Sequence, residues 1–198
     1  MNSIKNKGLR RGITGKAIAI IVVVSLLFGV LFCVISDAVE RKLFPREYSE
    51  YVEKYSVEYG IPEAVIYAVI RAESSFEPYA ISPSEPPALG LMQITEETYV
   101  WIGEILLGEE TSPAKIYDPE TNIRYGAYLL SYLYRRFENW DTVYAAYNAG
   151  MKRVYGWLDD PEYSDGNGNL VNIPYPETRT YVKRVAEYRA KYEKLYYN

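Results

Sequence analysis

The sequence predicts a mostly α-helical domain that follows a single N-terminal transmembrane helix. Two observations support this prediction: an uncharged apolar run at residues 17–36 and, beyond it, apolar residues that recur every three or four positions. Such spacing places apolar side chains on one face of a helix. The sequence contains no convincing strand with period-two alternation, apart from a short hairpin expected near Gly166. We therefore expect a compact helical domain with one irregular insert, at residues 159–175.

Length and composition limit the classes of function. A chain of 198 residues with 48% hydrophobic residues can bury one core of ordinary domain size, and a second independent domain is not expected. The absence of histidine excludes His-based nucleophile activation and His-containing zinc sites, and we expect no metal or cofactor. The one cysteine, Cys33, lies in the apolar run and has no partner within the chain for a disulfide. Carboxylates must therefore carry any acid–base chemistry.

Charge is distributed unevenly along the chain. Residues 1–16 hold five basic side chains and no acidic one, so the rest of the chain holds 17 basic residues (22 − 5) against 26 acidic ones. The net charge of that remainder is about −9 (17 − 26), which argues against nucleic acid as a partner. Tyrosine is abundant, at 22 residues; most are expected to pack in the core, while a minority in a cleft would suit sugar rings.

The apolar run at residues 17–36 is long enough to cross the roughly 30 Å hydrocarbon core of a membrane as a helix. Basic residues precede it and Asp37 follows it, which predicts a single-pass plasma-membrane protein with a cytoplasmic N-terminus and an extracytoplasmic domain. A cleaved signal peptide is the alternative, but the run is longer than usual and no clear cleavage site follows. A lipoprotein anchor at Cys33 is disfavoured because Phe32, which precedes it, is not small.

These features divide the chain into four expected parts. They are a basic cytoplasmic tail at residues 1–16, a transmembrane anchor at 17–36, a linker at 37–47 and a helical domain at 48–198. The membrane is thus one expected partner, through the N-terminal helix.

Glycine, proline and serine bound the first two helices of the domain. The first is predicted at residues 46–59, and Gly60 ends it. Pro62 is expected to open the second, in the first-turn position that proline tolerates. The pair at residues 74–75 and Pro78 end this second helix.

Side-chain caps indicate where the later helices begin. Thr95 is the expected N-cap of one helix, and Asp118, followed by Pro119, is the expected N-cap of the next. Asp141 is expected to cap a shorter helix. The predicted spans are 95–107, 118–137, 141–150, 151–158 and 177–196.

One carboxylate lies where a helix should be apolar. Glu73 follows Ile66, Val69 and Ile70 at the spacing of a single helical stripe. It also lies in the last turn, where the helix dipole disfavours a negative charge. Both effects raise the pKa of Glu73, and a carboxylic acid that stays protonated near neutral pH suits general-acid catalysis on a glycosidic oxygen. A partly exposed glutamate at a fraying helix end is the alternative that this segment alone leaves open.

Four short motifs follow one another in a fixed order. They are Glu73-Ser74, then Gly90-Leu91-Met92-Gln93-Ile94, then Ala146-Tyr147-Asn148-Ala149-Gly150, then Pro176-Glu177-Thr178-Arg179 with Tyr181-Val182. In these motifs the chain resembles the lytic transglycosylases of the soluble-lytic-transglycosylase (SLT) type, which share a lysozyme-like helical fold and cleave peptidoglycan glycan strands. The resemblance runs from about Tyr48 to the C-terminus and excludes the anchor.

The resemblance implies roles for particular residues. Glu73 would be the catalytic acid/base, with Tyr147 beside it. The substrate-binding residues that it implies are Gln93, Asn148, Glu177, Tyr181, Met92 and Ser82. The helical spacing agrees for Tyr147, which shares one face with Val143 and Gly150 and so points inward. The structural alternatives are core packing for Tyr147, a solvated turn for Gln93 and an ordinary first-turn glutamate for Glu177.

The chemistry implied by the family needs one carboxyl. Glu73 would protonate the oxygen between N-acetylmuramic acid and N-acetylglucosamine and then help the muramic C6 hydroxyl to attack the anomeric carbon, which leaves a 1,6-anhydro end. Ordinary glycosidases instead place two carboxyls across the bond. Two alternatives stay open: a hydrolase related to goose-type lysozyme, and a non-catalytic scaffold that binds the cell wall.

Two features depart from known patterns. Before the Gly90-Leu91 motif the family has a short Ser-Pro-x-Gly link, which is about two residues longer here because Ser82-Pro83 is followed by residues 84–87. After the motif, Thr95-Glu96 takes the place of the usual Met-Pro. The run from Asp165 resembles the opening of a calcium loop, but Leu170 takes the place of the glycine such a loop requires. A tight turn is therefore the expected structure of that run.

Overall fold

The structure, a computed structural model, describes residues 15–198, so almost all of the predicted basic tail at residues 1–16 lies outside the described residues. The chain divides into two compact units, one that ends at Pro45 and one that spans Arg46–Asn198.

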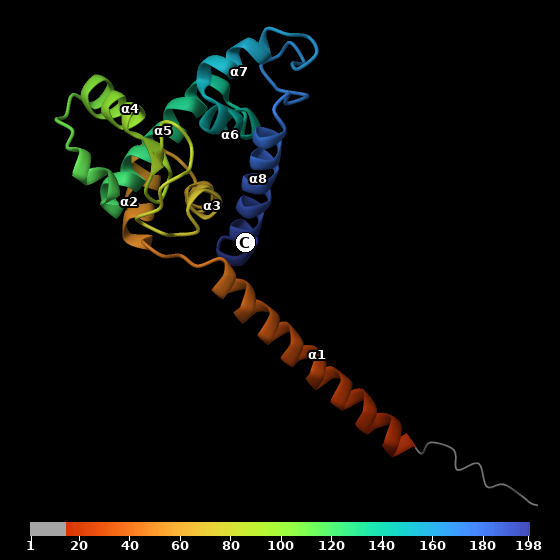
Figure 1. The fold of residues 1–198 in the computed structure, drawn as a ribbon. Helices are drawn as coiled ribbons and strands as arrows, with labels where there is room; N and C mark the ends of the chain where they lie inside the picture. The colour runs from red at the N-terminus through yellow and green to blue at the C-terminus, as the bar shows by residue number, and fades with distance from the viewer. Residues whose placement is uncertain (1–14) are drawn as a thin grey trace, which may run out of the picture. The chain divides into compact units, whose positions relative to one another are not determined.

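Helix α1, Gly15–Leu43, makes up the first unit as the structure describes it (Figure 1). Its segment Ile18–Leu43 is long and apolar enough to cross a membrane, with a mean hydropathy of 3.3 over its most apolar window. The helix continues past the apolar run, and an ion pair between Asp37 and Arg41, 2.8 Å apart on successive turns, supports this extension. Within residues 15–198, α1 is the one helix that meets this length and composition.

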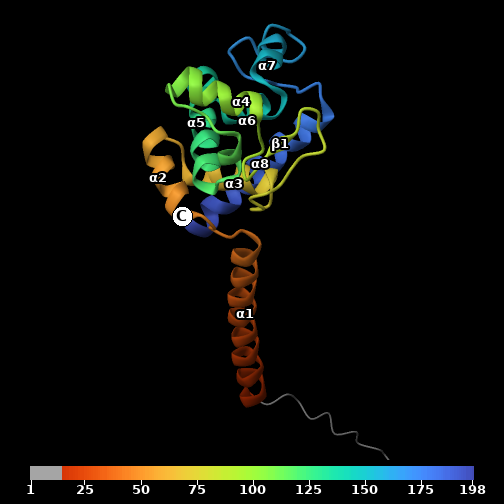
Figure 2. The ribbon, with the colours of Figure 1, turned by 60° about the vertical axis from the view of Figure 1, so that its left-hand side comes forward.

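The second unit is built from helices and one very short ladder (Figures 1 and 2), which confirms the predicted mostly α-helical domain. Its elements are α2 (Ser49–Tyr59), α3 (Glu63–Glu73), β1 (Ala88–Leu89), β2 (Ile94–Thr95), α4 (Glu96–Val100), the π-helix η1 (Trp101–Leu107), the 3₁₀-helix η2 (Pro113–Tyr117), α5 (Pro119–Phe137), α6 (Trp140–Ala149), α7 (Met151–Leu158) and α8 (Pro176–Tyr196).

Two of the three predicted side-chain caps are confirmed. The side chain of Thr95 accepts a hydrogen bond from the backbone N–H of Thr98, and Asp118 accepts one from Thr121. The prediction for α6 is wrong, because Asn139 caps the helix and Asp141 lies inside its first turn. Both residues can cap a helix, so their types alone do not decide between them.

The first two helices of the domain begin later than predicted. Tyr48 has a φ of 59°, a left-handed conformation that no helix continues through, so α2 starts at Ser49. Pro62 is extended and precedes α3 as its N-cap instead of entering the first turn. Gly60, also left-handed, ends α2 as predicted and donates to the carbonyl of Ser56.

The sequence did not predict the antiparallel ladder between β1 and β2. It pairs Ala88 with Thr95 and Leu89 with Ile94, and two residues per strand are too few to produce a recognisable alternation. The expected hairpin near Gly166 corresponds to an isolated antiparallel bridge between residues 164 and 170.

Helix α3 forms the centre of the second unit. Every residue from Ala64 to Ile70 is buried, so the helix is enclosed all round and not along one stripe only. It lies against α8, where Tyr67 stacks on Tyr192 with ring centroids 5.2 Å apart, and it also contacts α2 and α5 (Figures 1 and 2). The C-terminal end of α3 is therefore held in a fixed position by its neighbours.

Candidate active site

Glu73 is the last residue of α3 and faces a cavity. The helix ends there because Ser75 and Phe76 adopt left-handed conformations, with φ values of 52° and 71°. The hydroxyl of Ser74 donates to the carbonyl of Leu91, 2.8 Å away, and joins the helix end to the loop between β1 and β2. The cavity has a volume of ≈ 470 Å³, which lies within the range of roughly 300–1,000 Å³ that is usual for ligand sites. Its lining comprises Glu73, Ser82, Pro83, Ser84, Ala88, Gln93, Thr95, Tyr147, Asn148 and Glu177.

The carboxyl of Glu73 has the electrostatic properties of a general acid. Burial raises the pKa of Glu73 to about 7, while a hydrogen bond from Tyr181 and the positive charge of Arg184 act in the opposite direction. The hydroxyl of Tyr181 donates to Oε1 of Glu73 at 2.6 Å. The predicted rise of this pKa is confirmed, with burial as its main cause. Near neutral pH the group is therefore protonated in a large fraction of molecules.

Two tyrosines stand beside this carboxyl. Burial raises the pKa of both Tyr147 and Tyr181 well above the ordinary value, and the charge of Glu73 raises both further, so each hydroxyl stays neutral and can donate. Tyr181 donates to Glu73, whereas the hydroxyl of Tyr147 donates to the carbonyl of Met92, 2.8 Å away. Tyr147 still lines the cavity with Glu73, and its hydrogen bond positions the loop that contains Met92.

That loop is fixed by a buried asparagine that the sequence motifs did not single out. Asn122 of α5 is fully buried, and its Oδ1 accepts from the backbone N–H of Met92 at 2.7 Å. Its Nδ2 donates to the carbonyls of Ile116 and Leu89, at 2.7 and 3.1 Å. The partners lie 6 to 33 residues away in the sequence, so no local pattern reveals this clamp.

The loop places its two predicted binding residues differently. The side chain of Met92 is fully buried beside Gly126 of α5 and does not line the cavity, so it acts in the core and not as a wall of the site. Gln93 does line the cavity, and its Nε2 donates to the carbonyls of Ala80 and Gly90 at 3.1 and 2.9 Å. Oε1 of Gln93 is consequently the atom left to accept a hydrogen bond from a ligand.

Hydrogen bonds between Ser82 and Ala88 join the two ends of the lengthened loop at residues 83–87. The backbone N–H of Ser82 donates to the carbonyl of Ala88 at 2.9 Å, and the N–H of Ala88 donates to the hydroxyl of Ser82 at 2.8 Å. The hydroxyl of Ser82 shares a 2.6 Å hydrogen bond with the hydroxyl of Ser84, which itself donates to the carbonyl of Pro86 at 2.9 Å. The extra residues thus form a small loop of their own, and Ser82 remains in the cavity lining.

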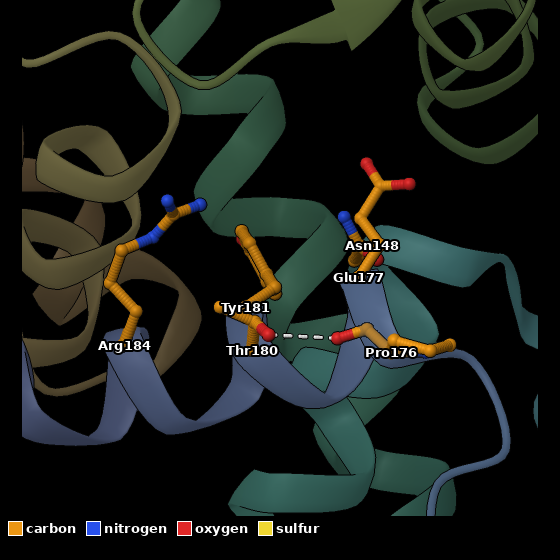
Figure 3. A pocket seen from close by; sticks show the side chains of 6 residues that line it. All are labelled: Asn148, Pro176, Glu177, Thr180, Tyr181 and Arg184. Atoms are coloured by element: carbon orange, nitrogen blue, oxygen red, sulfur yellow. Dashed lines mark hydrogen bonds between the residues drawn. The ribbon is translucent and has the colours of Figure 1, made fainter.

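Residues from α6 and α8 form the opposite wall. Oδ1 of Asn148 accepts from the hydroxyl of Thr178 at 2.8 Å, which ties the two helices together. Glu177 is exposed in the first turn of α8 and lines this cavity and an adjoining one of ≈ 400 Å³. Figure 3 shows the adjoining cavity, whose lining comprises Asn148, Pro176, Glu177, Thr180, Tyr181 and Arg184. Arg184 is a charged residue at this site that the sequence motifs did not include.

The run after Ser164 is a turn with several hydrogen bonds of its own and one, at 2.9 Å, from the side chain of Asn139 to that of Asn169. Oδ1 of Asp165 accepts from the backbone N–H groups of Asn167 and Asn169 at 2.7 and 3.1 Å, and its Oδ2 accepts from the side chain of Asn169 at 2.8 Å. The loop itself therefore satisfies this carboxylate, in agreement with the predicted turn. Within residues 15–198 no group of three or more His, Cys, Asp or Glu side chains is placed to hold a metal ion.

Comparisons with known proteins find one family. Its description is "Transglycosylase SLT domain", and the match covers residues 50–168. The soluble lytic murein transglycosylase of Escherichia coli K12 is 37% identical over 160 residues, which cover 79% of this chain and 24% of that protein. The membrane-bound lytic murein transglycosylase C of Yersinia pestis (strain Pestoides F) is 40% identical over 129 residues, or 64% of this chain and 33% of that protein.

Solved structures give the same result. The 70-kDa soluble lytic transglycosylase of Escherichia coli matches with a TM-score of 0.71 and 35% identity over 80% of this chain and 26% of that one. An inactive mutant of the lytic transglycosylase Slt from Pseudomonas aeruginosa matches with a TM-score of 0.67 and 32% identity over 77% of this chain and 25% of that one. The present chain spans about a quarter of the length of the soluble relatives that it matches.

Proposed function

Because this chain belongs to the SLT-domain family of transglycosylases, we propose that it is a lytic murein transglycosylase that cleaves the bond between N-acetylmuramic acid and N-acetylglucosamine in peptidoglycan. The observation that carries this proposal is the carboxyl of Glu73, which has a pKa of about 7 because of burial and lies in a cavity of ≈ 470 Å³. A protonated carboxyl in a cleft is what cleavage of a glycosidic bond requires.

In the first step Glu73 acts as the general acid. It gives its proton to the glycosidic oxygen as the bond from that oxygen to the anomeric carbon of N-acetylmuramic acid breaks. The carboxylate that forms is stabilised by the 2.6 Å hydrogen bond from Tyr181 and by the nearby charge of Arg184. The released N-acetylglucosamine carries the proton away as a hydroxyl.

In the second step the same residue acts as the base. The carboxylate of Glu73 takes the proton of the muramic C6 hydroxyl while that oxygen bonds to the anomeric carbon. The product is a 1,6-anhydro sugar, no water is consumed, and Glu73 is protonated again for the next cycle. One carboxyl is therefore sufficient for the whole reaction.

The cavity walls supply groups that suit an N-acetylated sugar. Oε1 of Gln93 can accept from an acetamido N–H, because the Nε2 group of this residue already donates to two backbone carbonyls. Ser82 and Asn148 lie on two sides of the same cavity and offer hydroxyl and amide groups to sugar hydroxyls. Thr95 also lines this cavity where the family often has methionine, which makes this wall more polar.

We further infer that α1 anchors the enzyme in the plasma membrane. Its apolar segment is long enough to span the bilayer, and relatives that match this chain are named membrane-bound lytic murein transglycosylases. Basic residues before the segment and Asp37 after it favour a cytoplasmic N-terminus and an extracytoplasmic catalytic domain. Cleavage would then be limited to glycan within reach of the membrane surface.

A hydrolase is the second candidate, and Glu177 favours it. This carboxyl lines the same cavity as Glu73, and enzymes that add water across a glycosidic bond use two carboxyls. The two reactions leave different ends on the glycan, an anhydro end or a reducing end.

Mass spectrometry of the products separates these functions. The full chain in detergent is incubated with purified peptidoglycan beside its Glu73→Gln and Glu77→Gln variants; Glu77 is an exposed glutamate four residues beyond the acid and serves as the matched control. We expect anhydro-muropeptides from the wild type and Glu77→Gln, and none from Glu73→Gln. Reducing ends would indicate the hydrolase, and absence of products with wall binding intact would indicate a scaffold.

A further inference from the structure

The adjoining cavity of ≈ 400 Å³ contains charged groups that transfer no proton in the proposed transglycosylase reaction. Helix α8 supplies Glu177, Tyr181 and Arg184, which are spaced four and three residues apart and so share one face. In Figure 3 the side chains of Glu177 and Arg184 extend from α8 on either side of Tyr181. Seven residues of helix separate the two charges by roughly 10 Å along the axis, so the cavity has an acidic end and a basic end.

Arg184 is the cation in the lining of this cavity. Its guanidinium lies 5.8 Å from the ring centroid of Tyr181, at the outer range of a cation–π contact. Within residues 15–198, no ion pair joins Arg184 to a carboxylate, in contrast to Arg189 on the next turns of α8, which pairs with Glu193 at 2.8 Å. An exposed guanidinium at the edge of a cavity can take a carboxylate in a two-pronged hydrogen bond.

Two other polar side chains of the cavity can bind a ligand: Asn148 as a hydrogen-bond donor and Glu177 as an acceptor. Oδ1 of Asn148 is occupied by Thr178, which leaves its Nδ2 group to donate to a ligand. The hydroxyl of Thr180 donates to the carbonyl of Pro176, as the dashed line in Figure 3 shows, so it is already used. Glu177 accepts hydrogen bonds only, and N–H groups of a ligand would suit it.

Tyr181 connects this cavity with the acid. It lines the cavity beside Arg184, and its hydroxyl donates to the carboxyl of Glu73. Asn148 and Glu177 line both cavities. A substituent on a sugar held at Glu73 can therefore reach the second cavity without leaving the protein surface.

We propose that this second cavity is a subsite for the acidic substituent of the muramic acid unit, with Arg184 binding a carboxylate and Glu177 accepting from N–H groups beside it. The inference rests on the proposed function, because it takes its ligand from the same glycan. The carboxylate has two sources, the lactyl group of a peptide-free muramic acid and the peptide attached to that group. Arg184 thereby acts in substrate selection, in addition to its electrostatic effect on Glu73.

Binding measurements test the subsite without requiring turnover. The detergent-solubilised full chain is titrated calorimetrically with an N-acetylglucosaminyl-N-acetylmuramoyl tripeptide, which lacks the bond to be cleaved. The same compound with amidated carboxyls and the peptide-free disaccharide with a free lactyl carboxylate are the other two probes. The variants are Arg184→Gln, Arg184→Lys and Lys183→Gln; the last removes the same charge from the adjacent residue, which is highly exposed and does not line the cavity.

We expect Arg184→Gln to weaken binding of a carboxylate probe about tenfold, the usual effect of removing a charged hydrogen-bond partner, and to leave the amidated probe within about twofold. Arg184→Lys should retain part of the preference, because the charge remains and the planar fork is lost. Lys183→Gln should bind as the wild type does. An effect on the peptide-free probe identifies the lactyl carboxylate as the ligand, and an effect on the tripeptide probe alone identifies the peptide.

Three outcomes would overturn the proposal: Arg184→Gln weakens charged and amidated probes equally, it weakens neither, or the wild type binds no probe. Thermal unfolding of each variant verifies that the fold is retained, which is expected because Arg184 is exposed. Product analysis on peptidoglycan is run in parallel. Carboxylate-selective binding without any cleavage product would refute the proposed transglycosylase activity and leave the subsite in place.

Discussion

Replacement of Tyr181 by phenylalanine removes one hydrogen bond and should change the pH dependence of cleavage in a defined direction. The hydroxyl of Tyr181 makes a 2.6 Å hydrogen bond to Glu73 and lowers the pKa of that carboxyl against the effect of burial. A hydrogen bond to a charged group contributes about 1.5–3 kcal/mol. Since 1.36 kcal/mol corresponds to one pH unit, its loss should raise the pKa of Glu73 from about 7 by roughly one to two.

The sign of the effect on rate follows from the role of the acid. In the proposed mechanism Glu73 must be protonated at the start of the reaction, so kcat/KM should fall as the pH rises through the pKa of Glu73. In Tyr181→Phe this fall should occur at higher pH. The maximal rate should decrease about 10- to 100-fold, because the carboxylate that develops on proton transfer loses the same stabilisation.

The assay is release of soluble muropeptides from purified peptidoglycan between pH 5 and 9. Tyr147→Phe is the matched control, because this buried hydroxyl donates to the carbonyl of Met92 and not to Glu73. Its rate is expected to fall, but the position of the alkaline limb should move much less. An alkaline limb that stays in place in Tyr181→Phe, or moves to lower pH, would refute the reasoning.

Three further predictions concern stability. The pKa of Glu73 is about 7 in the folded protein, against an ordinary value of 4.5, so the folded state loses up to about 3 kcal/mol of stability as the pH rises through this range. Glu73→Gln removes this loss and should therefore raise Tm more at pH 8 than at pH 4.5. An equal change of Tm at the two pH values would contradict the prediction. Asn122→Ala should lower the free energy of unfolding by about 3 kcal/mol or more in urea titrations, because it removes three hydrogen bonds, one from a buried N–H and two to carbonyls. A loss below about 1 kcal/mol would show that water replaces the clamp. Gly126→Ala should lower the free energy of unfolding by about 1–3 kcal/mol and reduce activity, because the new methyl group would overlap the side chain of Met92. Unchanged stability and activity would mean that Met92 can repack.

Much of the fold could be predicted because it depends on local signals. Apolar periodicity and the caps at Thr95 and Asp118 located most helices, and the predicted spans of α5, α7 and α8 agree with the structure to within one residue. The lysozyme-like fold class and the SLT family, inferred from the order of four motifs, are confirmed. The prediction was wrong where two neighbouring residues had similar capping ability, as at Asn139 and Asp141.

The contacts that assemble the site were less predictable, because they join residues far apart in the sequence. The stripe that ends at Glu73 correctly indicated an acid with a raised pKa, but the hydroxyl that binds it belongs to Tyr181, 108 residues away. Asn122 could not be distinguished from any other helical asparagine until its partners in the loop were known. Arg184 lies outside every motif, and its place in the second cavity depends on how α8 packs.

The complete enclosure of α3 has a consequence for motion during catalysis. Because the residues of this helix from Ala64 to Ile70 are all buried, we expect its amide hydrogens to exchange mainly through global unfolding. Glu73 is attached to the end of this helix, whereas the exposed link at residues 83–87 can fluctuate without disturbing it. In the proposed reaction the acid is thus held in one place, and adjustment to the glycan strand would come from the loops around it.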